Sequence, residues 1–315
     1  MNTESEQATH SALLLSWLQL LRVSALPTAI SNILAGFLVA SGDWLPVTNL
    51  LLLIASSCCL YMSGMVLNDW WDRDVDQLNR SNRPIPSGRV SSKAAFTGYL
   101  MLTLTGILLA AAVSMPSLGC AISLVVAIAL YDCVLKRTAI APMIMGLCRG
   151  LNILLGASAA PALQSNLLPG FTGSTIWIAV CLGIFITGVT WFARKESEGD
   201  NRRLLVSGSV IMVFGVAGFI LTPLVFDVAA SQSALLRYIA IVSLVALPIA
   251  VRAFAAIKSP MPANIGVTVG TALRSLILFD AAIAYLFSQC QVAYPIAILL
   301  LLIPALLMSR WISPT

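Results

Sequence analysis

The chain is poor in charged residues and has almost no histidine, and both shortages limit what it can be. Charged residues make up 10% of its 315 positions, against about 25% in soluble domains. Hydrophobic residues make up 59%, and the mean hydropathy is +0.93. This composition excludes an ordinary soluble domain and indicates a polytopic membrane protein. The single histidine, His10, lies in a polar N-terminal segment, so histidine cannot serve as a general base or metal ligand deeper in the chain.

Other common signatures are also missing. The seven cysteines lie mostly in apolar runs and form no CxxC or Cys/His pattern, which argues against a disulfide framework or a zinc site. Residues 1–10 contain no Lys or Arg and so lack the positive start of a signal peptide. We expect residues 1–11 to form a flexible tail. The net charge of +5 reflects an uneven distribution along the chain, and we expect no nucleic-acid partner.

Long apolar runs fill most of the remaining sequence. A transmembrane helix needs roughly 20 apolar residues, and each run is near that length. The sequence therefore predicts an all-α bundle of nine to ten transmembrane helices in a single domain, residues 1–315, embedded in a lipid bilayer. The predicted spans lie at 25–41, 48–68, 94–114, 117–135, 140–160, 175–194, 204–225, 235–256, 264–287 and 292–310.

Basic residues fall almost entirely on one side of these spans. The loops on that side and the adjoining span ends contain 14 of the 18 Lys and Arg residues. Such asymmetry marks the cytoplasmic side of a membrane protein. We therefore expect a multi-pass protein of the inner membrane with both termini in the cytoplasm. The 14 are Arg73, Arg80, Arg83, Arg89, Lys93, Lys136, Arg137, Arg194, Lys195, Arg202, Arg203, Arg252, Lys258 and Arg310.

The stretch from Asn68 to Ser91 interrupts the hydrocarbon with a dense group of charges. It holds four of the chain's 13 acidic residues within eight positions, namely Asp69, Asp72, Asp74 and Asp76. On a helix, the spacing of four stacks Asn68 or Asp69, Asp72 and Asp76 along one face. Ionisable groups next to a membrane are candidates for function; the alternative is a solvated cytoplasmic loop.

A second acidic cluster follows the sixth predicted span, with Glu196, Glu198 and Asp200 in the segment ARKESEGDNRR. Four spans separate the two clusters, so both must face the same side of the membrane. The interval from Asp72 to Glu196 is 124 residues, which suggests a duplicated four-helix unit with one acidic site in each. The alternative for this cluster is an ordinary charged loop.

Two facing carboxylate clusters predict a site for divalent cations. Mg²⁺ prefers hard oxygen ligands and is commonly held by carboxylates together with substrate phosphates. The adjacent Arg and Lys residues suit phosphate oxygens. We therefore expect an apolar cavity whose mouth binds the phosphorylated head of a long hydrocarbon molecule. A cation pathway is less favoured, because the acidic groups gather at one face.

These residues resemble a known family. NDWWDRDVDQLNRSNRPIPSG resembles the first signature of the UbiA superfamily of intramembrane prenyltransferases, through Asn68, Asp69, Asp72 and Asp76. ESEGD at 196–200 resembles the second signature, with Glu196 in place of the usual Asp. LRVSALPTAISNILAG and YDCVLKRT resemble further family elements, and the resemblance covers residues 15–290. YDCVLKRT, MGLCRGLNILLGAS and GVTWFARKE look most like the EboC-like bacterial branch.

The resemblance implies Mg²⁺-dependent transfer of a prenyl group from a polyprenyl diphosphate donor to an acceptor, often aromatic, that enters from the membrane. The site would lie on the cytoplasmic side. Its implied metal ligands are Asp72, Asp76, Glu196 and Asp200, with Asp69 and Glu198 as further candidates. Asn68, Arg22, Lys136 and Arg137 would contact the diphosphate or the metal.

Polar residues deeper in the spans leave two interpretations open. Arg149 and Asn152 lie one helical turn apart in the fifth span. In one interpretation they bind substrate, and Arg149 meets Asp132 or an anionic acceptor. In the other they form a structural contact between helices. Arg274 and Asp280 in the ninth span are predicted to pair structurally. Two other functions remain open for the whole chain: a transporter or binding protein for prenylated or phosphorylated lipids, and a non-catalytic subunit of a membrane complex.

Overall fold

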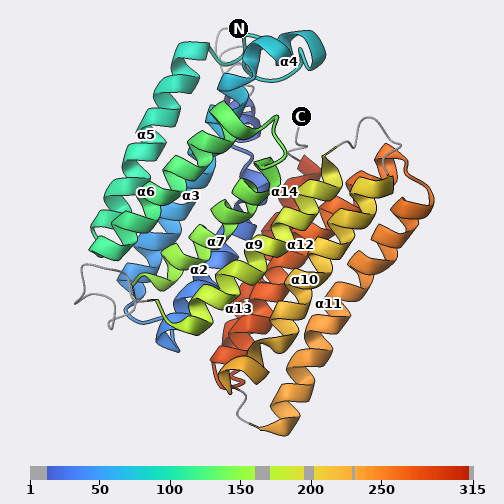
Figure 1. Ribbon diagram of the computed structural model, residues 1–315. Coiled ribbons are helices and arrows are strands. Elements are labelled where there is room, and N and C mark those ends of the chain that lie inside the picture. The colour runs from blue at the N-terminus through green and yellow to red at the C-terminus, as the bar shows by residue number, and fades with distance from the viewer. Residues whose placement is uncertain (1–12, 160–170, 195–201, 229–230, 312–315) are drawn as a thin grey trace, which may run out of the picture.

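The described part of the computed structural model, residues 13–159, 171–194, 202–228 and 231–311, is built from helices and contains no strand (Figure 1). Residues 13–20 are helical and lead into the 3₁₀ helix η1 (Val23–Ala25). The longer helices then run as α2 (Leu26–Ser41), α3 (Val47–Trp71), α4 (Arg73–Asn79), α5 (Ser92–Ala111), α6 (Met115–Ala129) with the π-helix η2 (Leu130–Leu135), α7 (Ala141–Ala157), α9 (Gly173–Ala193), α10 (Arg202–Phe226), α11 (Gln232–Lys258), α12 (Pro262–Phe287), α13 (Ala293–Leu299) and α14 (Leu302–Trp311).

The helix lengths confirm a membrane bundle. Eight helices in the described residues are long and apolar enough to cross a membrane, and two shorter apolar ones follow the same pattern. One of these is α7; the other is the tenth predicted span, which the structure divides between α13 and α14. Each predicted span thus corresponds to a helix or to a helix pair.

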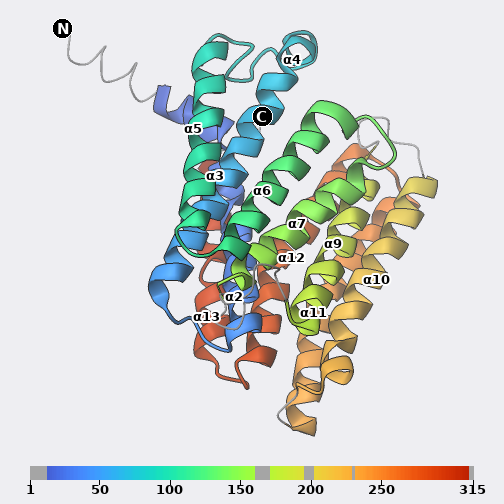
Figure 2. The ribbon, with the colours of Figure 1, turned by 60° about the vertical axis from the view of Figure 1, so that its left-hand side comes forward.

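Successive spans run in alternating directions, so every second connection lies at the same end of the bundle. Figures 1 and 2 place α4 and the C-terminal end of α14 at one end, hereafter the α4 end. Helix α3 arrives there and α5 leaves; η2 arrives and α7 leaves; α9 arrives and α10 leaves. The end of α9 and the start of α10, which flank the second predicted cluster in sequence, therefore lie at the same end of the bundle as the first cluster.

Helix α12 connects two buried apolar clusters. In one, Phe279 contacts Phe185 of α9 and Phe219 of α10, each with ring centroids 5.3 Å apart. In the other, Ile277 and Ala281 pack with the residues of α2, α3 and α6. Because adjacent positions of α12 face both clusters, this helix holds the two halves of the bundle together, and its inner face is buried as a result.

Glycines allow α2 and α7 to pack backbone against backbone. A Cβ at Gly36 would lie 2.2 Å from the carbonyl oxygen of Ile153, and a Cβ at Gly156 would lie 2.5 Å from that of Ile33. Small residues at helix contacts are the usual means of close packing in membranes, where van der Waals contact drives association. The α2–α7 crossing therefore depends on both glycines.

Replacing Gly36 by alanine should destabilise the protein by about 1–3 kcal/mol, because the new methyl group meets backbone that cannot move aside without separating the helices. Gly119→Ala is the matched control, since a Cβ there has nothing within 4 Å and alanine favours helix over glycine. Thermal or denaturant unfolding in detergent would measure both. A Gly36→Ala variant as stable as Gly119→Ala would contradict the assigned contact.

Candidate active site

The first acidic stretch is helical on both sides of a break at Asp72. Helix α3 ends at Trp71, Asp72 lies between helices with φ −84° and ψ 1°, and α4 begins at Arg73. The backbone ladder continues loosely through the break, from Asp72 N to Asn68 O (3.1 Å) and from Asp76 N to Asp72 O (2.8 Å). Asp69 and Asp76, from either side of the break, share one partner, whereas Asp72 at the break pairs with another, so the carboxylates form two groups.

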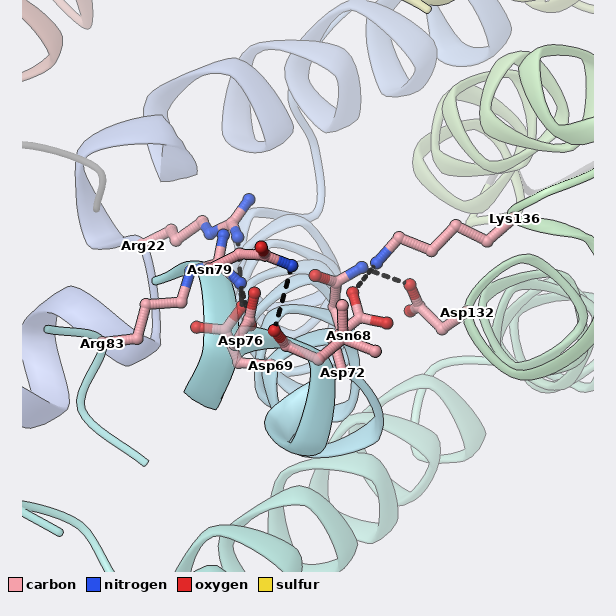
Figure 3. A network of polar contacts seen from close by, with 10 residues as sticks. Arg22, Asn68, Asp69, Asp72, Asp76, Asn79, Arg83, Asp132 and Lys136 are labelled. Atoms are coloured by element: carbon pink, nitrogen blue, oxygen red, sulfur yellow. Dashed lines mark hydrogen bonds and ion pairs between the residues drawn. The ribbon is translucent and has the colours of Figure 1, made fainter. Parts of the chain in front are cut away.

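The first group is joined by Arg83. Its guanidinium Nη1 donates to Asp69 Oδ1 at 3.2 Å and to Asp76 Oδ2 at 2.5 Å, as Figure 3 shows. All three side chains are buried, with at most 7% of their surface exposed. Buried ions need partners of opposite charge, so this arginine allows two carboxylates to lie close together.

The chain returns Arg83 to this position through the turn that follows α4. Ser87 N donates to the carbonyl of Arg83 and Val90 N to that of Pro84, each at 3.0 Å. Gly88 adopts φ 74°, a left-handed conformation that glycine adopts without steric cost. The RPIPSG segment is therefore a compact turn that folds back over the end of α3.

Arg22 supplies a second cation to the same group. Its Nη2 donates to Asp69 Oδ1 at 3.1 Å, and its side chain keeps 30% of its surface exposed. The Arg22 backbone has φ 46°, an uncommon conformation for a residue with a side chain. Arg22 thus connects the start of the bundle to α3 while part of its guanidinium remains accessible.

The second group lies toward η2. Lys136 Nζ forms an ion pair with Asp72 Oδ2, and Asn68 Nδ2 donates to Asp132 Oδ1 at 2.6 Å (Figure 3). Asp132 is buried, whereas Asp72 and Lys136 keep 21% and 29% of their side-chain surface exposed. Asp72 is therefore the most accessible of the four carboxylates in these two groups, Asp69, Asp72, Asp76 and Asp132.

The structure thus brings together most of the candidate residues of the first signature: Arg22, Asn68, Asp69, Asp72, Asp76 and Lys136. Arg137 is exposed beside them. Asp74 points into solvent with 81% of its side chain exposed and faces Arg73 at 3.6 Å. Sequence reasoning missed two members. Arg83 was counted only as a loop charge, and Asp132 only as a possible partner of Arg149.

A signal for each missed residue was present in the sequence. Arg83 opens the RPIPSG turn, and the two prolines that follow it, Pro84 and Pro86, restrict the backbone of that turn. Asp132 precedes Lys136 by four residues, so on a helix the two would share a face. The π-helical η2 carries Asp132 inward and leaves Lys136 at its end.

The second acidic cluster, Glu196, Glu198 and Asp200, lies outside the described residues. The flanking helices are joined by a hydrogen bond, which Trp191 Nε1 of α9 donates to Ser207 Oγ of α10 at 2.9 Å. The same two helices also pack closely at Gly188, where a Cβ would lie 2.5 Å from the backbone nitrogen of Met212.

Arg149 lies in a polar network within the bundle. Its Nη1 donates to Asn32 Oδ1 at 3.2 Å and its Nη2 to Thr28 Oγ1 at 3.1 Å, while its guanidinium lies 5.9 Å from the ring centre of Tyr61. Arg149 therefore contacts α2 and not Asp132, which pairs with Asn68.

Asp280 lies at the far side of the same network. Its Oδ2 accepts from Ser31 Oγ at 2.6 Å and Asn32 Nδ2 at 2.7 Å. The predicted pairing with Arg274 is wrong, because Asp280 is fully buried and Arg274 is exposed. Asn32 instead connects Asp280 to Arg149.

Asn152 makes a helix–helix contact. Its Oδ1 accepts from Ser57 Oγ at 2.7 Å, and its Nδ2 donates to the carbonyl of Ala29 at 3.0 Å. These two hydrogen bonds tie α7 to α3 and α2. The residue is almost fully buried, so its described contacts are those of helix packing.

The donor set suits Mg²⁺ in kind, although the described residues alone do not complete a site. Mg²⁺ takes carboxylate oxygens, and Asp72 and Asp76 supply them. Among the described residues, no three His, Cys, Asp or Glu side chains gather closely enough to hold a metal ion. The carboxylates are neutralised by Arg22, Arg83 and Lys136, so any further ligands would have to come from beyond the described residues or from a substrate.

Comparison with known proteins gives a consistent family match. The sequence profile of the UbiA prenyltransferase family matches residues 29–273. Digeranylgeranylglyceryl phosphate synthase from Saccharolobus solfataricus is 31% identical over 39% of this chain and 44% of its own length. Chloroplastic chlorophyll synthase from Arabidopsis thaliana is 31% identical over 63% of this chain and 53% of its own length. The chain thus spans about half the length of these curated relatives.

Solved structures share the fold. A structure described for digeranylgeranylglyceryl phosphate synthase superimposes with a TM-score of 0.67 at 19% identity, covering 88% of this chain and 99% of the other. A UbiA homolog from Archaeoglobus fulgidus bound to GPP and Mg²⁺ superimposes with a TM-score of 0.57 at 14% identity, covering 83% and 99%. Both likenesses concern the arrangement of helices.

Proposed function

The chain belongs to the UbiA prenyltransferase family, and from that premise we propose that it transfers a polyprenyl group from a prenyl diphosphate to an acceptor that reaches the site from the membrane, releasing diphosphate. The observation that carries the proposal is the combination at the α4 end of accessible Asp72 with the cations Lys136 and Arg22, each partly exposed. A prenyl diphosphate has a charged head and a hydrocarbon tail, so it needs a charged site at the end of an apolar bundle.

The reaction breaks the bond between the allylic carbon and a diphosphate oxygen, and the electron pair leaves with the diphosphate. The acceptor supplies the electron pair of the new carbon bond and loses a proton. Lys136 and Arg22 would bind the departing diphosphate, where negative charge develops, with Arg137 and Asn68 close by. The apolar interior would exclude water from the electron-poor carbon.

Asp72 and Asp76 would hold Mg²⁺ together with Glu196 and Asp200 of the second cluster. Asp69 and Glu198 are further candidate ligands. When bound, Mg²⁺ supplies positive charge to phosphate oxygens. Lys136 must then exchange Asp72 for the diphosphate, since its ammonium group now pairs with that carboxylate. Arg83 would keep Asp69 and Asp76 in place throughout. We assign Arg149 to the acceptor, and Asn152 to positioning the helix that carries Arg149.

Labelled geranylgeranyl diphosphate incubated with the protein in native membrane vesicles tests the function. We expect Mg²⁺-dependent release of diphosphate that EDTA abolishes and that Asp72→Asn reduces strongly. A transporter or binding protein of the same fold is the second candidate, because Glu196 stands where the second signature usually has Asp. Binding of the donor without any cleavage in vesicles that contain the native acceptor would favour it and overturn the proposed transfer.

The finer resemblance to the EboC-like branch, carried by YDCVLKRT and MGLCRGLNILLGAS, belongs to this proposal as well. We propose an aromatic acceptor, as the family resemblance implies. Mass spectrometry of compounds that accumulate when the protein is withdrawn from its host would identify the acceptor, and an accumulated acceptor without an aromatic ring would exclude this assignment.

We also propose that the protein resides in the inner membrane with the α4 end in the cytoplasm. Support comes from the basic residues, because Arg80, Arg89 and Lys93 adjoin that end and such residues favour the cytoplasm.

In a cysteine-free background, single cysteines at Ser87 and Arg202 should react with an impermeant thiol reagent only from the cytoplasmic side. Cysteines at Asp43 and Asp227, in the opposite connections, should react only from outside. Labelling of positions 87 and 202 from opposite sides would contradict both the topology and a site shared by the two acidic clusters.

A further inference from the structure

Two arginines on the exposed faces of α11 and α12 lack an acidic partner in the described part of the chain. Arg252 and Arg274 are both exposed, and both lie within helices suited to cross a membrane. The ion pairs that the described residues form use Arg22, Arg73, Arg83 and Lys136 instead. A cation in a membrane helix is costly unless an anion or water reaches it, so these two residues require an explanation.

The two guanidinium groups converge on one turn of α12. Arg252 Nη1 donates to Thr271 Oγ1. Arg274 Nη1 and Nη2 lie 3.5 and 3.6 Å from the position that a Cβ of Gly270 would occupy. Gly270 and Thr271 are adjacent, so charges from two helices meet at the same place. Because Gly270 has no side chain, the guanidinium of Arg274 lies close against the backbone of this turn.

This turn lies within reach of the membrane surface at the α4 end. Gly270 follows the first residue of α12, Pro262, by eight positions, which corresponds to about 12 Å at the helical rise of 1.5 Å per residue. Arg274 extends back by one turn toward that end, the direction in which long cationic side chains reach for headgroups. Helices of this length also project somewhat beyond a hydrocarbon core of about 30 Å.

A second copy of the chain would not supply the missing negative charge from its described residues. The acidic residues within the described spans are Asp69, Asp132 and Asp280, and all three are buried. The remaining described carboxylates lie in the connections at the bundle ends. Within reach of these two side chains, the available anion is therefore the phosphate of a lipid.

We propose that Arg252 and Arg274 bind the phosphate of an anionic phospholipid in the leaflet at the α4 end, with the phosphate contacted by both guanidinium groups. Guanidinium groups present paired donors that match phosphate oxygens. An anionic headgroup is preferred over a zwitterionic one, since the ammonium of the latter brings a positive charge to a site that already holds two. This binding does not depend on the proposed prenyl transfer.

Native mass spectrometry of the detergent-purified full chain tests the site, with added phosphatidylglycerol or phosphatidylcholine. We expect phosphatidylglycerol to bind more tightly, and Arg252→Gln with Arg274→Gln to weaken its binding by about tenfold or more. Arg237→Gln is the matched control, because Arg237 is an exposed arginine near the other end of α11. It should leave phosphatidylglycerol binding unchanged.

Three results would overturn the proposal: unchanged phosphatidylglycerol binding by the double glutamine variant, an equal loss in Arg237→Gln, or displacement of the lipid by millimolar inorganic phosphate. If the double glutamine variant fails to fold, Arg252→Lys with Arg274→Lys replaces it, since lysine keeps the charge but loses the paired donors. That variant should bind phosphatidylglycerol more weakly than the unaltered chain, and equal binding would again contradict the site.

Discussion

Replacing Arg83 by glutamine should destabilise the protein by about 3–5 kcal/mol, the usual cost of removing one partner from a buried ion pair. Arg83 neutralises Asp69 and Asp76 at once, so its loss leaves two buried carboxylates in mutual repulsion. Arg22 contacts only Asp69 and cannot replace it. The end of α3 and the whole of α4 should then become poorly ordered, and donor binding should be lost with them. Denaturant unfolding followed by α-helical circular dichroism would measure the effect.

Arg80→Gln provides the matched control, because Arg80 lies at the end of α4 with its side chain exposed. Its loss should change stability by less than about 0.5 kcal/mol. Adding Asp69→Asn to Arg83→Gln should recover part of the stability, since one unpaired charge disappears. An Arg83→Gln variant as stable as Arg80→Gln would show that the ion pairs of Arg83 with Asp69 and Asp76 do not stabilise the fold.

Asp76→Asn should lower the rate of diphosphate release by about 100-fold, the upper part of the range seen when metal-site partners are removed. The amide keeps the shape of the side chain but loses the charge that would attract Mg²⁺ and that now balances Arg83. Single-turnover assays with a labelled prenyl diphosphate and saturating Mg²⁺ would measure the loss.

Asp74→Asn is the control, on the same short helix and two residues away. Asp74 has 81% of its side chain exposed and should tolerate the change within about twofold, as surface substitutions usually do. Equal losses of activity in Asp76→Asn and Asp74→Asn would show that only the total negative charge of α4 matters. Full activity in both variants would show that α4 is not part of the site.

The bundle itself could be predicted because its signals are local. Runs of about 20 apolar residues mark spanning helices, and the distribution of basic residues predicts which helix ends lie on the same side of the membrane. The last span divides at Leu300 and Leu301, between α13 and α14, and no change in hydropathy marks that break. Hydropathy reports burial in hydrocarbon but not the continuity of the backbone.

The site could be predicted only in part, because its geometry depends on tertiary contacts. The spacing of the acidic residues in the first stretch indicated that their side chains gather, and Asp69, Asp72 and Asp76 lie together at the α4 end. It wrongly implied one helical face, since the helix breaks at Asp72. The bridge from Arg83 depends on a turn that folds back over α3, and a spacing rule based on a continuous helix cannot represent that return.

The inward position of Asp132 has a similar cause. Its hydrogen bond to Asn68 spans 64 residues of sequence and follows from the packing of η2 beside α3. Likewise, Asp280 was matched to Arg274 by proximity in sequence, whereas the fold pairs it with Ser31 and Asn32 of α2. Burial of a charge creates a need for partners, but only the fold decides which partners are within reach.

Equilibrium binding of a non-cleavable prenyl thiodiphosphate, with and without Mg²⁺, tests most directly whether the carboxylates at the α4 end hold the donor through a metal ion. The unaltered protein should bind the analogue tightly only with Mg²⁺, and Asp72→Asn should lose at least tenfold in affinity when the metal is present. Tight binding that is indifferent to both Mg²⁺ and Asp72→Asn would contradict a metal-dependent donor site at this end of the bundle.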